Sequence, residues 1–212
     1  IRNTIVGAEA AKALTDADHN VAIGFRALFA DTLGSKSIAI GDVALVNQNF
    51  TSATDAYNVA IGHEAGNAVT TGIQNTLIGG LAGDALLAAA DNVAVGFEAL
   101  STETGGQNNV AIGPRALKAQ VNSSGNVYNT AVGANAGASV TTGVNNTLIG
   151  GLAGDALTDA DNNVAVGRGS LSADTLGSRA TAIGFGALSS QNFTTATDTY
   201  NTAVGFNAGV AV

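Results

Sequence analysis

The chain lacks several residue types on which common folds and functions depend. Its 212 residues include no Cys, Met or Trp and a single proline, Pro114, and charged residues make up only 11%. Without Cys there can be no disulfide, so cysteine usage leaves the redox compartment open. The formal net charge of −8 is the opposite of the basic surface that nucleic-acid phosphates attract. We therefore expect no nucleic-acid partner.

Long apolar runs and a leader pattern are missing as well. No stretch approaches the roughly 18 apolar residues of a membrane span, so we expect no membrane insertion within this segment. The chain begins at Ile1, without Met and without the charged and apolar regions of a secretory signal. We expect residues 1–212 to be one repeat domain and a fragment of a longer fibre.

Signals of catalysis and cofactor binding are weak. The two histidines, His19 and His63, are not accompanied by a recognisable nucleophile and acid, and no nucleotide-binding glycine motif precedes a helix. We expect no enzyme, no cofactor and no resident metal. Calcium stays an alternative, because the stretch Gly79–Leu86 and the acidic turns Asp16–Asp18 and Asp159–Asp161 offer carboxylate oxygens. Aspartate in such turns more often caps the turn.

A repeated pentapeptide is the dominant feature of what is present. Asn20–Gly24 (NVAIG) returns with small changes along the whole chain, which has 28 glycines and is 46% hydrophobic. Each copy ends in a glycine, and after Gly7 these anchoring glycines are Gly24, Gly41, Gly62, Gly79, Gly96, Gly113, Gly133, Gly150, Gly167, Gly184 and Gly205.

The spacing of these glycines defines two periods. Most are separated by a step of seventeen, as Gly24 and Gly41 are, and every fourth step is longer by three or four. The longer period spans four such steps and is also visible as near-identity between Asn75–Leu86 and Asn146–Leu157. A short fixed period is typical of a solenoid in which each unit stacks on its neighbours. We predict an all-β solenoid of twelve coils, arranged as three four-coil super-repeats.

Each position of the motif has its own chemistry. The residue before the glycine is always Ile or Val, the next is mostly Ala, the third is Val or Thr except at Ile38, and the fourth is mostly Asn. β-Branched residues around a small residue favour a strand. Identical amides at strand spacing predict an Asn ladder along the rod. We expect each anchoring glycine to have a positive φ or to lie where no Cβ fits.

Alternation along the strand predicts two apolar faces. The Ile/Val and Val/Thr columns share one face, and the Asn, Ala and Gly columns share the other. A strand that is apolar on both sides is normally covered on both sides. We expect the Ile/Val column to line the inside of the coil and the Ala column to pack against other copies in a homotrimer, because so thin a coil has little core of its own.

The repeat resembles two known families. The unit read at Asn109–Ala116 (NVAIGPRA) is similar to the head repeats of YadA-like trimeric autotransporter adhesins, and Asn58–Gly72 and Asn129–Gly143, which end in TTG, resemble repeats of phage tail fibres. The resemblance implies a left-handed parallel β-roll, intertwined as a homotrimer. It implies an extracellular location on a virion fibre or a bacterial cell surface. The steady seventeen-residue coil favours the fibre over the adhesin, whose coils are mostly shorter.

The resemblance and the composition together predict a structural function. We expect a rigid fibre segment for attachment; the alternatives are an adhesin head that binds host matrix or cells, an ice-binding solenoid and a subunit that polymerises end to end. A signal peptide with a C-terminal membrane β-barrel in the complete gene would favour the adhesin. The long connections offer candidate contacts with a host-surface glycan or protein, at Phe50, Tyr57, Tyr128, Phe193 and Tyr200. The interpretation that we favour is that these rings pack the connections down onto the neighbouring coil or subunit.

Overall fold

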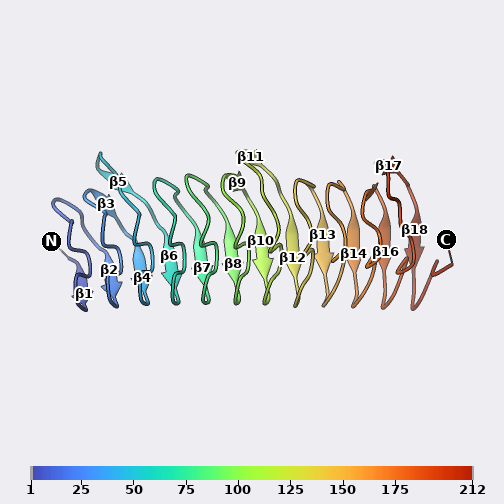
Figure 1. Cartoon of the computed structure of the whole chain (residues 1–212), viewed down its shortest axis with the longest axis horizontal. Coiled ribbons are helices and arrows are strands. Elements are labelled where there is room, and N and C mark those ends of the chain that lie inside the picture. Colours follow the sequence, from blue (N-terminus) through green and yellow to red (C-terminus); the bar gives the residue numbers. More distant parts are fainter. Residues whose placement is uncertain (1, 212) are drawn as a thin grey trace.

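The computed structural model describes residues 2–211, which wind into a rod of stacked coils (Figure 1). Each coil contributes one three-residue strand to a twelve-stranded parallel sheet. Its strands, in spatial order, are β1 (Thr4–Val6), β2 (Val21–Ile23), β4 (Ile38–Ile40), β6 (Val59–Ile61), β7 (Thr76–Ile78), β8 (Val93–Val95), β10 (Val110–Ile112), β12 (Thr130–Val132), β13 (Thr147–Ile149), β14 (Val164–Val166), β16 (Thr181–Ile183) and β18 (Thr202–Val204).

The register of this sheet follows the motif. Equivalent residues of consecutive motifs lie opposite each other, as when Ala94 of β8 pairs with Ala111 of β10. The predicted all-β parallel solenoid of twelve coils, each about seventeen residues long, is therefore confirmed. No helix occurs in residues 2–211. Accordingly, this part of the chain contains no helix suited by length and apolarity to cross a membrane.

The prediction of which face lies inside was wrong. The Ala column is the interior, and its members from Ala22 to Ala182 are fully buried, whereas the Ile/Val column points outward. Ile112, for example, is 39% exposed. The reason is the width of the coil. Leucines from the opposite wall, such as Leu100 and Leu117, fill the interior and leave room for little more than a methyl group on the strand.

A large strand residue inside the rod is accompanied by glycine on the facing wall. In two coils the strand carries a leucine, Leu77 or Leu148, in place of Ala, and the fourth residue after the glycine is then Gly instead of Leu. A Cβ on Gly83 would lie 2.7 Å from Leu77 Cδ2 and 2.9 Å from Leu86 Cδ1. A Cβ on Gly66, in the preceding coil, would also lie 2.7 Å from Leu77 Cδ1. The strand leucine therefore accounts for the glycine in both coils of a pair.

The predicted Asn ladder is present and buried. Asn75 Nδ2 donates to the Ala89 carbonyl at 2.9 Å, and Asn75 Oδ1 accepts from the backbone N–H of Asn92 at 3.1 Å. The same two bonds recur at most coils, so each side chain joins its own coil to the next. Because these amides are fully buried, the ladder removes polar groups that would otherwise lack partners.

The anchoring glycines lie where two coils approach most closely. Their φ angles fall between +126° and +141°, which L side chains rarely adopt. A Cβ on Gly96 would lie 2.6 Å from the carbonyl carbon and oxygen of Gly113. The positive φ and the lack of room for a Cβ therefore occur together in this column, except at Gly205, where the nearest atom to a Cβ would be Ala208 Cβ at 3.8 Å.

The long connections project from one edge of the rod (Figure 1). Each carries a two-residue strand that pairs in parallel with the coil before it. The three pairs are β3 (Gly34–Ser35) with β5 (Thr54–Asp55), β9 (Gly106–Gln107) with β11 (Gly125–Asn126), and β15 (Gly177–Ser178) with β17 (Thr197–Asp198).

Candidate functional site

Three clusters of polar and aromatic side chains lie where the long connections return to the coils. Each combines a Tyr at the end of a connection, a residue of the short strand within it, and a residue at the equivalent corner of the preceding coil. We call them the loop clusters; they are Lys36, Asp55 and Tyr57; Asn108, Asn126 and Tyr128; and Arg179, Asp198 and Tyr200. Equivalent members occupy the same place in successive super-repeats of the sequence.

The first loop cluster is held by the Lys36 ammonium group. Its Nζ donates to Asp55 Oδ2 at 2.5 Å and to the Tyr57 hydroxyl at 3.0 Å, and it lies 5.0 Å from the centre of the Tyr57 ring. The hydrogen bond to Asp55, followed by that to Tyr57, raises the pKa of Lys36 to about 12. The amine therefore stays charged over the physiological range, and the tyrosine ring is fixed in place while 51% of Tyr57 is exposed.

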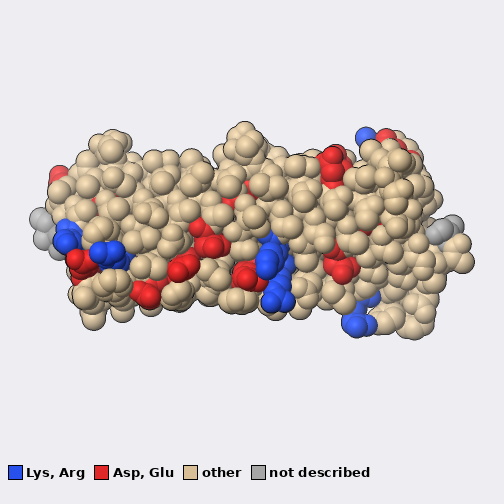
Figure 2. Space-filling view, viewed as in Figure 1, with Lys and Arg blue, Asp and Glu red and all other residues tan. Residues whose placement is uncertain are grey.

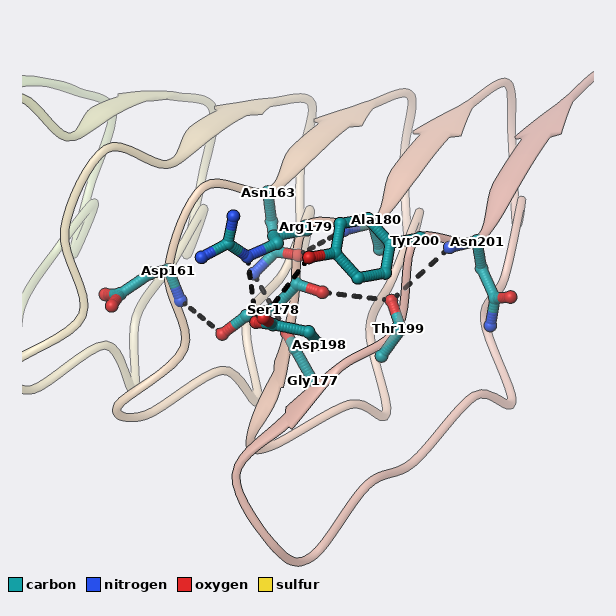
Figure 3. Close-up of polar contacts among 10 residues, drawn as sticks. All are labelled: Asp161, Asn163, Gly177, Ser178, Arg179, Ala180, Asp198, Thr199, Tyr200 and Asn201. Atoms are coloured by element: carbon teal, nitrogen blue, oxygen red, sulfur yellow. Dashed lines mark hydrogen bonds and ion pairs between the residues drawn. The ribbon is translucent and has the colours of Figure 1, made fainter.

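The third loop cluster uses a guanidinium group in the same role (Figure 3). Arg179 Nε lies 2.8 Å from Asp198 Oδ1, and the Tyr200 hydroxyl donates to Asp198 Oδ2 at 3.4 Å. The guanidinium carbon is 5.7 Å from the centre of the Tyr200 ring. The hydrogen bond to Asp198 raises the pKa of Arg179, and Tyr200 is 68% exposed.

The middle loop cluster is built from uncharged groups. Asn108 Nδ2 donates to Asn126 Oδ1 at 2.9 Å, and Asn126 Nδ2 donates to the Tyr128 hydroxyl at 3.0 Å. Tyr128 is 53% exposed. All three clusters thus present a tyrosine ring whose hydroxyl is oriented by a planar carboxylate or amide, or by the amine bound to one.

The candidate aromatic residues therefore divide into two groups. Phe50 is buried, and a Cβ on Gly34 would meet its Cδ2 atom at 2.7 Å, so it packs the connection onto the coil. Phe193, at the equivalent position, is half-buried. The three tyrosines stay exposed, so packing accounts for the phenylalanines and not for the tyrosines.

Sequence reasoning missed a buried carboxylate beneath each connection. Asp31 is fully buried, and its carboxylate accepts from the backbone N–H groups of Gly34 and Phe50 and from Gln48 Nε2, the last at 2.6 Å. Gln48 Oε1 in turn accepts from Asn58 of the Asn ladder at 2.8 Å. Equivalent networks surround Glu103 with Gln120 and Asp174 with Gln191. Their signal was available, because an acid is followed one coil later by a Gln in every super-repeat.

A second candidate surface is the outward face of the long sheet. It consists of the Ile/Val column and the Val/Thr column, and the strand residues on it carry no charge. Most of the charged side chains visible in Figure 2 gather in a few places, and much of the surface belongs to other residues. We call the outward face of the long sheet the outer face.

The two histidines, His19 and His63, lie exposed on the surface of the rod. His63 Nε2 lies 3.5 Å from Asp42 and 3.8 Å from Glu64 on an exposed edge. Within residues 2–211, no three His, Asp or Glu side chains are placed to hold a metal ion. In the stretch Gly79–Leu86, which was considered for calcium, Asp84 Oδ1 is buried without a hydrogen-bond partner. Asp155 Oδ1, in the near-identical stretch Asn146–Leu157, is also buried without one.

Comparison with known families, with curated proteins and with solved structures finds no match for the chain.

Proposed function

We propose that the chain is a rigid segment of an extracellular fibre used for attachment, and that three copies assemble through the outer face. The observation that carries this proposal is the exposure of an uncharged sheet face along the whole rod. Twelve strands about 4.8 Å apart and about 10 Å long give roughly 600 Å². The largest apolar patch on a typical monomer covers about 300–600 Å², so this face lies at the upper end of that range, and one side of a specific interface buries about 800 Å².

The structure also favours a mechanical role. Backbone bonds and the glycine contacts join each coil to the next in the same way, and the Asn ladder does so at most coils. A load along the rod is therefore shared by equivalent bonds in each of the coils. Such an element transmits position and orientation, which is what a fibre shaft or the stalk of an adhesin needs. We place it on a virion fibre, with a bacterial surface adhesin as the alternative.

Single cysteines test this assembly, because the chain has no Cys of its own. Three copies around an axis place the same residue at the same height, so an Ile112→Cys variant is expected to be cross-linked between chains by a short bismaleimide. Ser124→Cys, in the exposed tip of a connection, is the matched control and is expected to stay largely single-chain. Equal cross-linking of both variants, or of neither, would contradict assembly through the outer face.

Ice binding is a second candidate for the same surface. The Thr/Val column was expected to be buried, but it lies on the outer face, and six of its twelve members are Thr (Thr4, Thr76, Thr130, Thr147, Thr181 and Thr202). A flat uncharged sheet with this ladder of hydroxyl and methyl groups is a surface on which water could order. An outer face covered in a trimer cannot bind ice. Thermal hysteresis from a monomeric protein would favour this candidate, and its absence would remove it.

A further inference from the structure

The tyrosines of the loop clusters are not required by the coil. Their position, five residues before the anchoring glycine, has a positive φ in every coil from His19 onward, and in the coils without a long connection it holds residues such as Gln74, Asp91 and Asn145. The backbone therefore accepts Gln, Asp or Asn at this corner. Burial does not explain the tyrosines either, since each is more than half exposed.

Each tyrosine is nevertheless held in one orientation. Its hydroxyl is bonded to Lys36, Asn126 or Asp198, and those groups are bonded to a second residue of the same cluster. A rigid exposed ring next to fixed planar hydrogen-bonding groups loses little conformational entropy when it binds a ligand. Tyrosine is suited to this because its ring is apolar and its tip is polar.

The charges of the clusters limit the class of ligand. Lys36 is paired with Asp55, Arg179 is paired with Asp198, and the middle cluster contains amides alone. Each cluster is therefore close to neutral, on a chain whose net charge is −8. The clusters therefore offer no excess positive charge to bind a polyanion such as a nucleic acid or a sulfated glycan. The chemistry instead fits hydroxyl groups next to a C–H surface, which is what a neutral sugar ring presents.

The clusters recur along a straight line. They lie four coils apart, which corresponds to roughly 19 Å at a strand spacing of about 4.8 Å, and the three connections project from the same edge of the rod in Figure 1 and form protrusions along that edge in Figure 2. A ligand that meets all three sites must repeat the same chemical group at intervals. We propose that the three loop clusters are equivalent subsites for one neutral polysaccharide chain.

This inference names the class of ligand for the attachment role proposed above, and it rests on that role. It does not depend on assembly into a trimer, because each chain carries its own three subsites. A failure of assembly, read from cross-linking, is therefore distinguishable from a failure of binding. Each subsite is small and exposed, so a short oligosaccharide is expected to bind weakly. A polymer that spans the subsites gains affinity because its second and third contacts are intramolecular, by about 100-fold.

Affinity electrophoresis in native gels tests the inference. The probes are dextran, amylopectin and galactomannan as neutral polysaccharides, with heparin and duplex DNA as polyanions. The wild-type protein is expected to be retarded by at least one neutral polysaccharide and by neither polyanion. A triple variant, Tyr57→Gln, Tyr128→Gln and Tyr200→Gln, is expected to lose affinity by at least about tenfold.

Two controls keep the result interpretable. Glutamine already occupies this corner at Gln74, so the triple variant is expected to melt close to the wild-type temperature. Gln74→Ala with Asn145→Ala changes the same corner in coils without a connection and is expected to leave retardation unchanged. The proposal is overturned if no neutral polysaccharide retards the wild type, if the triple variant is retarded equally, or if the polyanions bind more tightly.

Discussion

At the scale of single residues, the anchoring glycines set how closely two coils can stack. Gly96 combines a φ of +136° with backbone atoms of Gly113 at 2.6 Å from the position of a Cβ. Gly80, in the neighbouring coil, is different: a Cβ there would meet nothing nearer than Phe97 Cδ2 at 3.6 Å, an ordinary contact. Substitution of Gly96 therefore tests the φ and the coil spacing that the fold requires. Substitution of Gly80 tests only the effect of adding a side chain.

Gly96→Val is expected to destabilise the protein by about 3 kcal/mol, because strain at a disallowed φ is added to a backbone clash. Gly80→Ala is expected to change the free energy of unfolding by less than about 0.5 kcal/mol. Chemical denaturation monitored by circular dichroism measures both. An unchanged unfolding midpoint for Gly96→Val would show that the coils can move apart at no cost.

The two carboxylates with one buried, unpartnered oxygen give a prediction on pH. Loss of solvent raises the pKa of Asp84 and of Asp155, so the folded state disfavours their charged forms. Stability from these groups is present when both are protonated, below the ordinary carboxyl pKa, and is lost as pH rises through the raised folded pKa. Asp84→Asn with Asp155→Asn is therefore expected to melt above the wild type at pH 7, by a margin that shrinks toward pH 3.

The exposed Asp91 provides the control for that comparison. Asp91→Asn is expected to follow the wild-type melting temperature over the same pH range. If the double variant instead melts below the wild type at pH 7, the two carboxylates make a favourable interaction as anions, and the account of their burial is wrong.

At the scale of the single coil, the interior is a fixed volume shared between two walls. Leu77→Ala alone is expected to cost about 2–5 kcal/mol by leaving a cavity. Gly83→Leu alone is expected to be destabilising through overlap with Leu77 and Leu86. The double variant removes the overlap with Leu77, although Leu86 stays in place, so its cost should be smaller than the sum by about 1–3 kcal/mol. Strict additivity in denaturant titrations would show that the two walls are independent.

The coil also shows how far sequence reasoning reached. The period, the parallel strands, the Asn ladder and the alternation of the two faces follow from spacing and residue type, and the structure has them. The inside was misassigned because both faces are apolar, and hydrophobicity does not distinguish them. Size does: the Leu column opposite the strand leaves room for Ala and excludes Ile.

Only the tyrosines of the loop clusters were predictable from the sequence, and their partners were not. The tyrosines stand out because they end the long connections. Their partners Lys36, Asn108 and Arg179 lie a full coil and its connection earlier in the sequence. No local motif joins residues so far apart. Once the register of the coils is known, each tyrosine and its partner are seen to lie at equivalent corners of adjacent coils, and the three-residue loop cluster can be identified.

At the scale of the whole molecule, the outer face decides between the accounts of function. A rod whose interior is mostly Ala and Leu has a thin core, and one uncharged sheet face stays open along its length. In a trimer the three faces would meet at the axis, and the loop clusters, whose tyrosines come two residues before strands of the outer face, would lie at the border of the interface. In a stable monomer the face would have to serve a different purpose, such as ordering water.

Sedimentation equilibrium across a wide dilution series tests this claim most directly. The proposal predicts a single species of three times the 20.7 kDa mass of one chain, which persists to low concentration and loses its fold when it dissociates. A species with the mass of one chain that keeps its circular dichroism spectrum and cooperative melting on dilution would contradict it, because the outer face would then be stable in contact with water.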